Sequence, residues 1–149
     1  MRVCQIAGRV SALPAGYELI EGPPQIDDYL DLRLRSGLSS KNEAQARAAL
    51  PGSWASCHIV HDGRAVAMGR VIGDGGWYFH VVDMATLPEH QRRGLGSAVL
   101  ARLLEQIRIR APRGAYVSLI ADVPGRPLYE RYGFTETAPQ SVAMALIAD

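Results

Sequence analysis

From residue 17 onward, hydrophobic residues occur in short segments, and their spacing within each segment is typical of either a strand or a helix. Residues 17–20 predict a first strand, which the turn-forming residues 22–24 end. From Gln25 the period becomes helical, and Gly37 is a suitable C-cap for this helix. The shared helical face consists of Ile26, Tyr29, Leu30, Arg33 and Leu34. A second short helix is predicted from Lys41 to Leu50, capped by Ser39 or Ser40.

The middle of the chain predicts strands and then one long helix. Strands over 54–60 and 65–72 flank Asp62-Gly63, a strong hairpin turn signal. A third strand, 77–84, leads through a turn into a helix whose apolar positions recur at three- and four-residue spacing. These positions are Val99, Leu100, Leu103, Leu104 and Ile107.

After this helix, residues 116–121 predict a buried strand, 124–132 a short helix and 142–147 a last strand. A strand–helix–strand step makes the strands at 77–84 and 115–121 parallel. Helices that precede a strand meander, followed by this step, indicate an α+β or mixed α/β fold. No repeat or linker interrupts the chain, so we expect a single domain over residues 1–149.

The turn before the long helix, Gln91 to Gly96, is a candidate anion site. The first N–H groups of a helix have no partner inside it, and the helix dipole favours negative charge there. Gly94 and Gly96 lack the Cβ atoms that would keep a phosphate from the backbone. An alternative is a glycine-capped loop before an ordinary amphipathic helix.

Two familiar phosphate fingerprints do not fit this turn. A P-loop needs Lys and then Ser or Thr after its second glycine, and here Ser97-Ala98 follow. A dinucleotide fingerprint needs a third glycine where Val99 stands.

Net charge, cysteine spacing and the length of apolar runs limit the kinds of partner and site that we expect. The 149 residues carry a formal net charge of +1, which gives no general attraction to nucleic acid or to an acidic membrane. Cys4 and Cys57 lack a paired spacing, so we expect neither a disulfide framework nor a metal site, and Cys57 is expected in the core. The sequence has no apolar run long enough to span a membrane and no signal peptide, so we expect a cytoplasmic protein.

Two separated motifs resemble one known family. Gln91-Arg92-Arg93-Gly94-Leu95-Gly96 fits Q/R-x-x-G-x-G/A, and residues 128–134, LYERYGF, fit L/F-Y-x-x-x-G-F. In this order the motifs resemble the GNAT superfamily of acetyl-CoA-dependent N-acetyltransferases. The resemblance implies a central mixed sheet of about six to seven strands flanked by about four helices. It also implies that the two parallel strands splay apart to admit the pantetheine arm of acetyl-CoA, with no metal required.

The same resemblance implies the cofactor-binding residues. The backbone of the strand end is expected to pair with pantetheine, with the Met84 N–H facing the acetyl carbonyl, and the glycine loop is expected to wrap the pyrophosphate. The full expected set is Met84, Ala85, Thr86, Gln91, Arg92, Arg93, Gly94, Leu95, Gly96, Ser97 and Asp122. Asp122 stands where many relatives have Asn, and an ionised Asp accepts hydrogen bonds but does not donate them.

Three residues are candidates for the chemistry. Tyr129 matches the tyrosine that serves as general acid toward the coenzyme A thiolate in resembling enzymes; a core tyrosine is the alternative. His80 stands fourteen positions before the first loop glycine, where the base function lies in some resembling enzymes, and its ordinary pKa of about 6.5 suits that role. Its alternative is a strand histidine bonded to backbone. Asp83 is a competing base that simple alternation points away from the His80 face, unless a bulge reverses this.

The expected function is direct transfer of the acetyl group of acetyl-CoA to the primary amine of a small molecule in a ternary complex. An acceptor site could be lined by Tyr29, Arg33, Arg35, Trp54, Trp77, Tyr78 and Phe79, most of which could equally pack in the core. Alternatives are acetylation of a protein N-terminus or lysine, and a non-catalytic acyl-CoA sensor. The expected partner is a small-molecule amine without nucleic acid or membrane, and a homodimer is compatible with the sequence.

Overall fold

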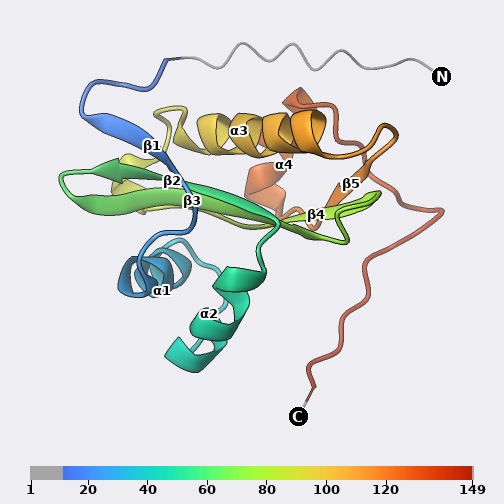
Figure 1. Cartoon of the computed structure of the whole chain (residues 1–149), viewed down its shortest axis with the longest axis horizontal. Helices are drawn as coiled ribbons and strands as arrows, with labels where there is room; N and C mark the ends of the chain where they lie inside the picture. Colours follow the sequence, from blue (N-terminus) through green and yellow to red (C-terminus); the bar gives the residue numbers. More distant parts are fainter. Residues whose placement is uncertain (1–11, 149) are drawn as a thin grey trace. The chain divides into compact units, whose positions relative to one another are not determined.

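The computed structural model describes residues 12–148, and Cys4 therefore lies outside the described residues. The described chain falls into two units, residues 12–119 and residues 120–148, each of which is described by itself. The first unit holds a five-stranded sheet with three α-helices, and the second holds one short α-helix (Figure 1). The expectation of a single domain stays a prediction.

The sheet runs in chain order, β1-β2-β3-β4-β5. Its strands are β1 Tyr17–Glu21, β2 Ala55–His61, β3 Arg64–Gly73, β4 Tyr78–Thr86 and β5 Tyr116–Leu119. The first four are antiparallel, and β5 pairs with β4 in parallel, as the strand–helix–strand step predicts. The predicted Asp62-Gly63 turn is also confirmed, because both residues have the positive φ values, 49° and 76°, that this hairpin type requires.

Helices cover both faces of the sheet (Figure 1). Helix α3, Leu95–Arg110, packs on one face against β2, β3 and β4, and α1, Ile26–Arg35, packs on the other against β3 and β4. Helix α2, Glu43–Ala49, contacts α1 and leads into the 3-10 turn η1, Leu50–Gly52. The core holds the predicted apolar positions of α3, and Cys57 is fully buried, as expected. No helix within residues 12–148 is long and apolar enough to cross a membrane.

Helix α1 ends as predicted but buries a different face. Gly37, at φ +88°, follows the helix, and Leu38 N–H bonds to Arg33 O at 3.0 Å, which closes a Schellman motif. Leu32 is fully buried, whereas Leu34, which was expected on the apolar face, is 66% exposed. The error has a simple cause, since the face turned to the sheet is centred on Tyr29, Leu32 and Arg33 and leaves Leu34 on the flank.

Helix α2 starts later than predicted. Its N-cap is Asn42, not Ser39 or Ser40: the Asn42 side chain accepts from Gln45 N–H at 2.8 Å, and Gln45 Oε1 accepts from Asn42 N–H at 3.0 Å. This reciprocal capping box satisfies two backbone donors at once. Ser39 instead accepts hydrogen bonds from Arg33.

We predict that Asn42→Ala lowers the free energy of unfolding by about 1 kcal/mol, because it removes this cap. Ser40→Ala is the matched control and should change stability by less than about 0.5 kcal/mol. Chemical denaturation of both variants measures the difference. Equal losses would show that the cap does not lie at Asn42.

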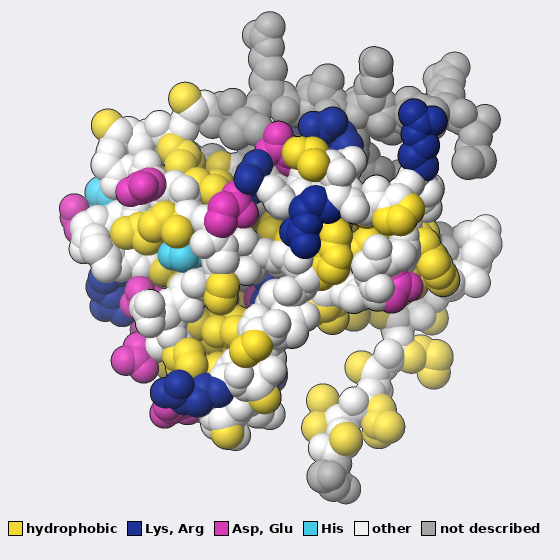
Figure 2. Space-filling model, in the orientation of Figure 1, with side chains coloured by type: hydrophobic (Ala, Val, Ile, Leu, Met, Phe, Trp, Pro, Cys, Tyr) yellow, Lys and Arg dark blue, Asp and Glu magenta, His cyan; other side chains and the backbone are white. Residues whose placement is uncertain are grey.

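The second unit departs from the predicted strand pattern. It contains the 3-10 turn η3, Val123–Gly125, and α4, Arg126–Arg131, in place of one helix over 124–132. The predicted last strand, 142–147, is wrong: residues 142–148 form no strand, and Met144 is 91% exposed. Alternation describes a strand's two faces but supplies no pairing partner, and none lies within residues 120–148. Figure 2 shows hydrophobic side chains along this extended end of the chain.

The predicted buried strand at 116–121 is shorter and less buried than expected. β5 covers four residues at the edge of the sheet, and Tyr116 is 46% exposed. An apolar run therefore did not distinguish a central strand from an edge strand. Residues 12–148 hold five strands in place of the predicted six or seven, together with four α-helices, and the predicted α+β mixed-sheet fold is otherwise confirmed.

Candidate active site

A β-bulge interrupts β4 at Asp83 and Met84. Met68 of β3 pairs with Ala85 and Arg70 pairs with Val82, so Gly69 alone faces two residues of β4. Asp83 has φ +57°, a left-handed conformation that is uncommon for a residue other than glycine. Such bulges re-aim side chains next to functional sites.

The bulge puts His80 and Asp83 on the same face of the sheet. Directly paired residues share a face, so Val82, and His80 two residues before it, lie on the face of Arg70. Asp83 lies on that face as well, because it contacts Arg70 and residues of α1. Met84 points to the opposite face, where a Cβ added to Gly69 would lie 2.5 Å from its sulfur. The structure thus contains the bulge that reverses the alternation argument.

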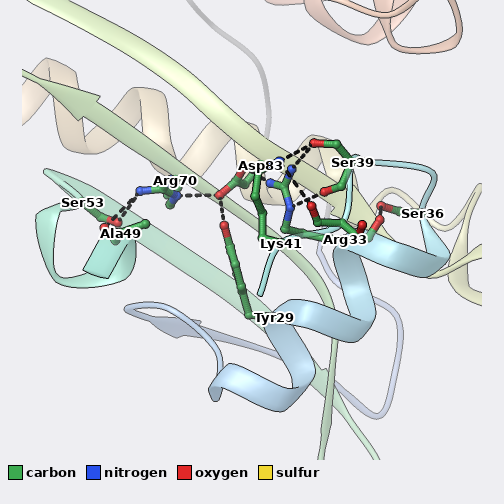
Figure 3. A network of polar contacts seen from close by, with 10 residues as sticks. Tyr29, Arg33, Ser36, Ser39, Lys41, Ala49, Ser53, Arg70 and Asp83 are labelled. Carbon is green, nitrogen blue, oxygen red and sulfur yellow. Dashed lines mark hydrogen bonds and ion pairs between the residues drawn. The ribbon is translucent and has the colours of Figure 1, made fainter. Parts of the chain in front are cut away.

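The Asp83 carboxylate is the centre of a buried polar cluster (Figure 3). Tyr29 Oη donates to Oδ2 at 2.6 Å, Arg70 Nε donates to the same oxygen at 2.6 Å, and Arg33 Nη1 donates to Oδ1. The side chains of Arg33, Asp83 and Arg70 are only 8%, 10% and 14% exposed. Arg33 also donates hydrogen bonds to the backbone carbonyl and the hydroxyl of Ser39. Arg70 also donates to the Ala49 carbonyl and the Ser53 hydroxyl.

This cluster keeps Asp83 ionised. Burial alone would raise the pKa of its carboxyl, but hydrogen bonds from Tyr29 and Arg70 and the charges of Arg70 and Arg33 outweigh burial and lower it. Burial and the neighbouring Asp83 carboxylate raise the pKa of the Tyr29 hydroxyl. A carboxylate held by three donors is a weak base, so the geometry favours a fixed structural charge at Asp83 over proton transfer.

His80 is half-buried and has one side-chain partner. Its Nδ1 lies 2.7 Å from Ser118 Oγ on β5, and this hydroxyl can donate onward to Phe79 O at 3.5 Å. In that arrangement Nδ1 carries the hydrogen, and the Nε2 lone pair is left to accept a proton. Burial lowers the pKa of His80 below 6.5, so the ring is neutral at pH 7 and suited to act as a base.

The end of β4 lacks a partner strand on the β5 side. The parallel ladder joins four residue pairs and stops at Val81 and Leu119. Beyond it, residues 82–86 of β4 continue without a strand on this side within the unit 12–119. The open edge includes the predicted positions Met84, Ala85 and Thr86, although Gln91 Nε2 donates to Thr86 O at 3.2 Å. Backbone groups at such an edge can pair with an extended ligand.

The predicted anion loop follows this edge. Gly94, at φ +79°, is the N-cap of α3 and makes no side-chain cap, so the first N–H groups of a 16-residue helix lie behind a residue without a side chain. A Cβ at Gly94 would meet no atom within 4 Å, which places the position in open space. Gln91, Arg92 and Arg93 are exposed, whereas Leu95 is buried and anchors the helix. The loop therefore fits a diphosphate, which needs convergent N–H groups and nearby cations.

Tyr129 and Asp122 belong to the second unit. Tyr129 lies in α4, with its ring 6.1 Å from that of Phe134 and 3.1 Å from the Cβ position of Gly125. Burial and the Asp122 carboxylate raise the pKa of the Tyr129 hydroxyl. The phenol is therefore protonated at neutral pH, as a proton donor must be.

The residues expected to line an acceptor site do not gather in one place. Phe79 is fully buried and its ring contacts that of Trp54. The guanidinium carbon of Arg110 lies 4.1 Å from the centre of the Trp54 ring. Trp77 and Tyr78 instead form an exposed aromatic surface with Tyr116. Arg35 pairs with Glu89 and Asp31. Of the expected residues, Tyr29 lines a small, shallow hollow beside Asp83, whereas Arg33 is not part of its lining.

Sequence reasoning missed two residues of this site. Arg70 interrupts the apolar run of β3, and a charged residue in a buried strand was a signal that it had a buried partner. Ser118 gave no comparable signal, because its contact with His80 depends on the register of two parallel strands far apart in sequence.

We predict that the lower limb of the activity–pH profile has its midpoint below pH 6.5 and disappears in His80→Ala. The base must be neutral to accept the amine proton, and burial lowers the pKa of His80, so activity is lost as the pH falls through that lowered value. Initial rates between pH 5 and 8 measure the limb. His58→Ala, which removes a histidine bonded to the Gly22 carbonyl, is the control and should keep the limb. Persistence of the limb in His80→Ala would exclude this base.

Comparison with known proteins identifies the family. The sequence profile of the acetyltransferase (GNAT) domain matches residues 53–136, more than half of the chain. A protein of unknown function from meticillin-resistant Staphylococcus aureus, described as a probable acetyltransferase, is 35% identical, with a TM-score of 0.85 over 89% of this chain and 99% of that one. No curated protein matches the sequence significantly.

More distant structures share the fold. Glucosamine-6-phosphate N-acetyltransferase from Arabidopsis thaliana is 18% identical, with a TM-score of 0.65 over 89% of this chain and 99% of that one. An aminoglycoside acetyltransferase from an uncultured soil sample is 17% identical, with a TM-score of 0.66 over the same shares. The profile match and the 35% identical relative together show that this chain is an acetyltransferase of the GNAT family, whose membership implies the use of acetyl-CoA.

Proposed function

We propose that this protein transfers the acetyl group of acetyl-CoA directly to the primary amine of a small molecule within a ternary complex. The observation that carries the proposal is the succession of an open β4 edge and a helix N-terminus that begins at a left-handed glycine. An extended arm can pair with the edge while its diphosphate binds the N–H groups of the loop.

In this proposal each binding element has a separate task. The loop residues 91–97 hold the diphosphate, and the exposed guanidiniums of Arg92 and Arg93 add charge-assisted contacts. The backbone of Met84, Ala85 and Thr86 orients the pantetheine arm, and Asp122 stays a proposed contact to it. When bound, acetyl-CoA supplies an activated thioester, so the chain itself needs to provide only orientation, a base, an acid and an N–H donor.

The proposed proton transfers balance. His80 takes a proton from the ammonium form of the acceptor, whose lone pair then forms the new C–N bond as the C–S bond breaks. The Met84 N–H stabilises negative charge on the carbonyl oxygen during the transfer. The thiolate leaves with the sulfur electron pair and receives a proton from Tyr129. The nitrogen gives up its second proton as the amide forms, and a proton from solvent restores the Tyr129 phenol. The proton held on His80 is released to solvent, so that one proton is released for each acetyl group transferred. Asp83 takes no proton in this scheme.

Small acceptors are supported by two relatives that share the fold and are named for acetylation of glucosamine-6-phosphate and of aminoglycosides. At 18% and 17% identity this likeness concerns the fold, so the class of acceptor rests on the experiment. A panel of primary amines, with release of coenzyme A thiol as the readout, tests it. Turnover only with peptides would identify a protein acetyltransferase, and tight binding of acetyl-CoA without turnover would identify a sensor. Cytoplasmic location stays a prediction.

A further inference from the structure

The Asp83 cluster links the bulge of β4 to two other elements of the fold. The carboxylate bonds to Tyr29 and Arg33 of α1 and to Arg70 on the neighbouring strand β3. We propose that these four residues, called the Asp83 clamp, act as positioning residues that fix the bulge and thereby aim the Met84 N–H at the thioester carbonyl. The inference rests on the proposed function, in which Met84 donates that hydrogen bond.

The first argument is conformational. Asp83 has φ +57°, and a non-glycine residue keeps such a conformation only where its surroundings hold it. Three donors on the two carboxylate oxygens supply that restraint, at a side chain that is only 10% exposed. The carboxylate cannot turn away without leaving two buried guanidiniums without a counter-charge.

The second argument is that the bulge is also restrained from the opposite face. There Met84 lies over Gly69, and a Cβ at Gly69 would also come within 2.8 Å of Val99 Cγ1 on α3. With the Asp83 side chain fixed on the α1 face and Met84 fixed on the α3 face, the peptide group between them has one orientation. That peptide group carries the Met84 N–H.

The third argument is the absence of a competing role for the carboxylate. Its strong donors and its place between two arginines make it a poor base, whereas burial lowers the pKa of His80 on the same face, and the neutral ring can accept a proton. A buried charge that takes no proton still has to be explained, since burying charges is costly unless they are paired. Holding the bulge explains it.

The first test is Asp83→Asn. Asn has the same size and, like Asp, tolerates positive φ, so the change removes mainly the charge. We expect kcat to fall about 100-fold, as when one oxyanion donor is lost, with the affinity for acetyl-CoA changed by less than about threefold. The lower limb of the pH profile should stay, because His80 is untouched. Loss of that limb would instead make Asp83 the base and overturn the inference.

A spectroscopic readout separates positioning from general loss of structure. In the wild type, the Met84 amide resonance should respond differently to acetyl-CoA and to coenzyme A, and Asp83→Asn should lose this difference while the loop amides still respond to both. The three-bond coupling of residue 83, which reports its φ, should change as well. An unchanged coupling together with an unchanged Met84 response would overturn the clamp.

Two further variants provide an alternative to Asp83→Asn and a control for it. Tyr29→Phe removes one hydrogen bond without unpairing a charge, and should lower kcat about three- to tenfold even where Asp83→Asn fails to fold. Asp28→Asn is the matched control: Asp28 also ties α1 to β3, through Arg64 at 3.2 Å and Ala65 N–H at 3.0 Å, but at the first two residues of β3, whereas the bulge is opposite Gly69. It should alter stability and leave kcat unchanged. Equal loss of kcat in Asp28→Asn and Tyr29→Phe would reduce the clamp to ordinary helix packing and overturn it.

Failure of the proposed function has a different signature. A wild type that shows neither turnover nor a Met84 response to acetyl-CoA would remove the proposed function, and the role of the clamp with it. A wild type that responds, beside an Asp83→Asn variant that responds equally, would remove the clamp alone.

Discussion

Replacement of Gly94 by valine should weaken the binding of acetyl-CoA about 100-fold or more. The new side chain would occupy the open space in front of the first N–H groups of α3, where the proposed diphosphate has to approach them. Hydrogen bonds from such groups to a charged phosphate contribute about 1.5–3 kcal/mol each. Loss of one or two of them accounts for this change, since about 1.4 kcal/mol is a factor of ten. Isothermal titration with acetyl-CoA and with coenzyme A measures it.

Gly114→Val is the matched control. Gly114 lies beyond the other end of α3, at φ +86° and with open space around its Cβ position, so a valine there meets the same backbone strain as at Gly94, where φ is +79°. Both variants should therefore lose a similar free energy of unfolding, of about 1–3 kcal/mol. Only Gly94→Val should lose affinity. Comparable affinity in the two variants would show that the loop does not hold the diphosphate.

Tyr129→Phe should lower kcat about 100-fold and leave the dissociation constant of acetyl-CoA nearly unchanged, because general acid catalysis contributes about 10²–10⁴ in rate. The raised pKa of Tyr129 keeps the proton available at neutral pH, and phenylalanine preserves the ring contact with Phe134. Steady-state kinetics and titration calorimetry of the same preparation separate the two effects.

The control for this change is Tyr132→Phe, three residues later in the same motif. It should keep kcat within about threefold, because the proposed mechanism assigns no proton transfer to Tyr132. Parallel losses of rate and affinity in Tyr129→Phe would indicate that Tyr129 shapes the fold of its own unit and does not donate the proton.

The parts of this fold that could be predicted are those that depend on neighbours in sequence. The turn at Asp62-Gly63, the helix after Gly94 and the cap at Gly37 each follow from a local rule about positive φ or periodicity. The Asn42 cap was also readable, since Asn-Glu-Ala-Gln carries the paired residues of a capping box at the required spacing. The prediction chose Ser39 or Ser40 because serine and asparagine are equally favourable at the N-cap position.

The site was only half predictable, because its geometry depends on one inserted residue. A bulge shifts alternation by one position, and nothing in a single strand's pattern reports that shift. The partners of Asp83 stand 54, 50 and 13 residues away from it, so no local rule joins them. The failed last strand has the same origin, since a strand requires a partner that its own sequence does not specify.

The short β4–β5 ladder has a consequence for how the site opens. Four parallel residue pairs hold β5, against seven antiparallel pairs between β2 and β3, and β5 is partly exposed along its length. Segments with the fewest supporting contacts separate first in local opening of a native protein. β5, which pairs with β4 next to the open edge, is therefore the strand of this sheet that separates most readily, whereas the bulge of β4 is fixed by ion pairs. Local opening of β5 would accommodate the entry of a long, flexible cofactor arm, while the bulge of β4 at Asp83 and Met84 would keep its position.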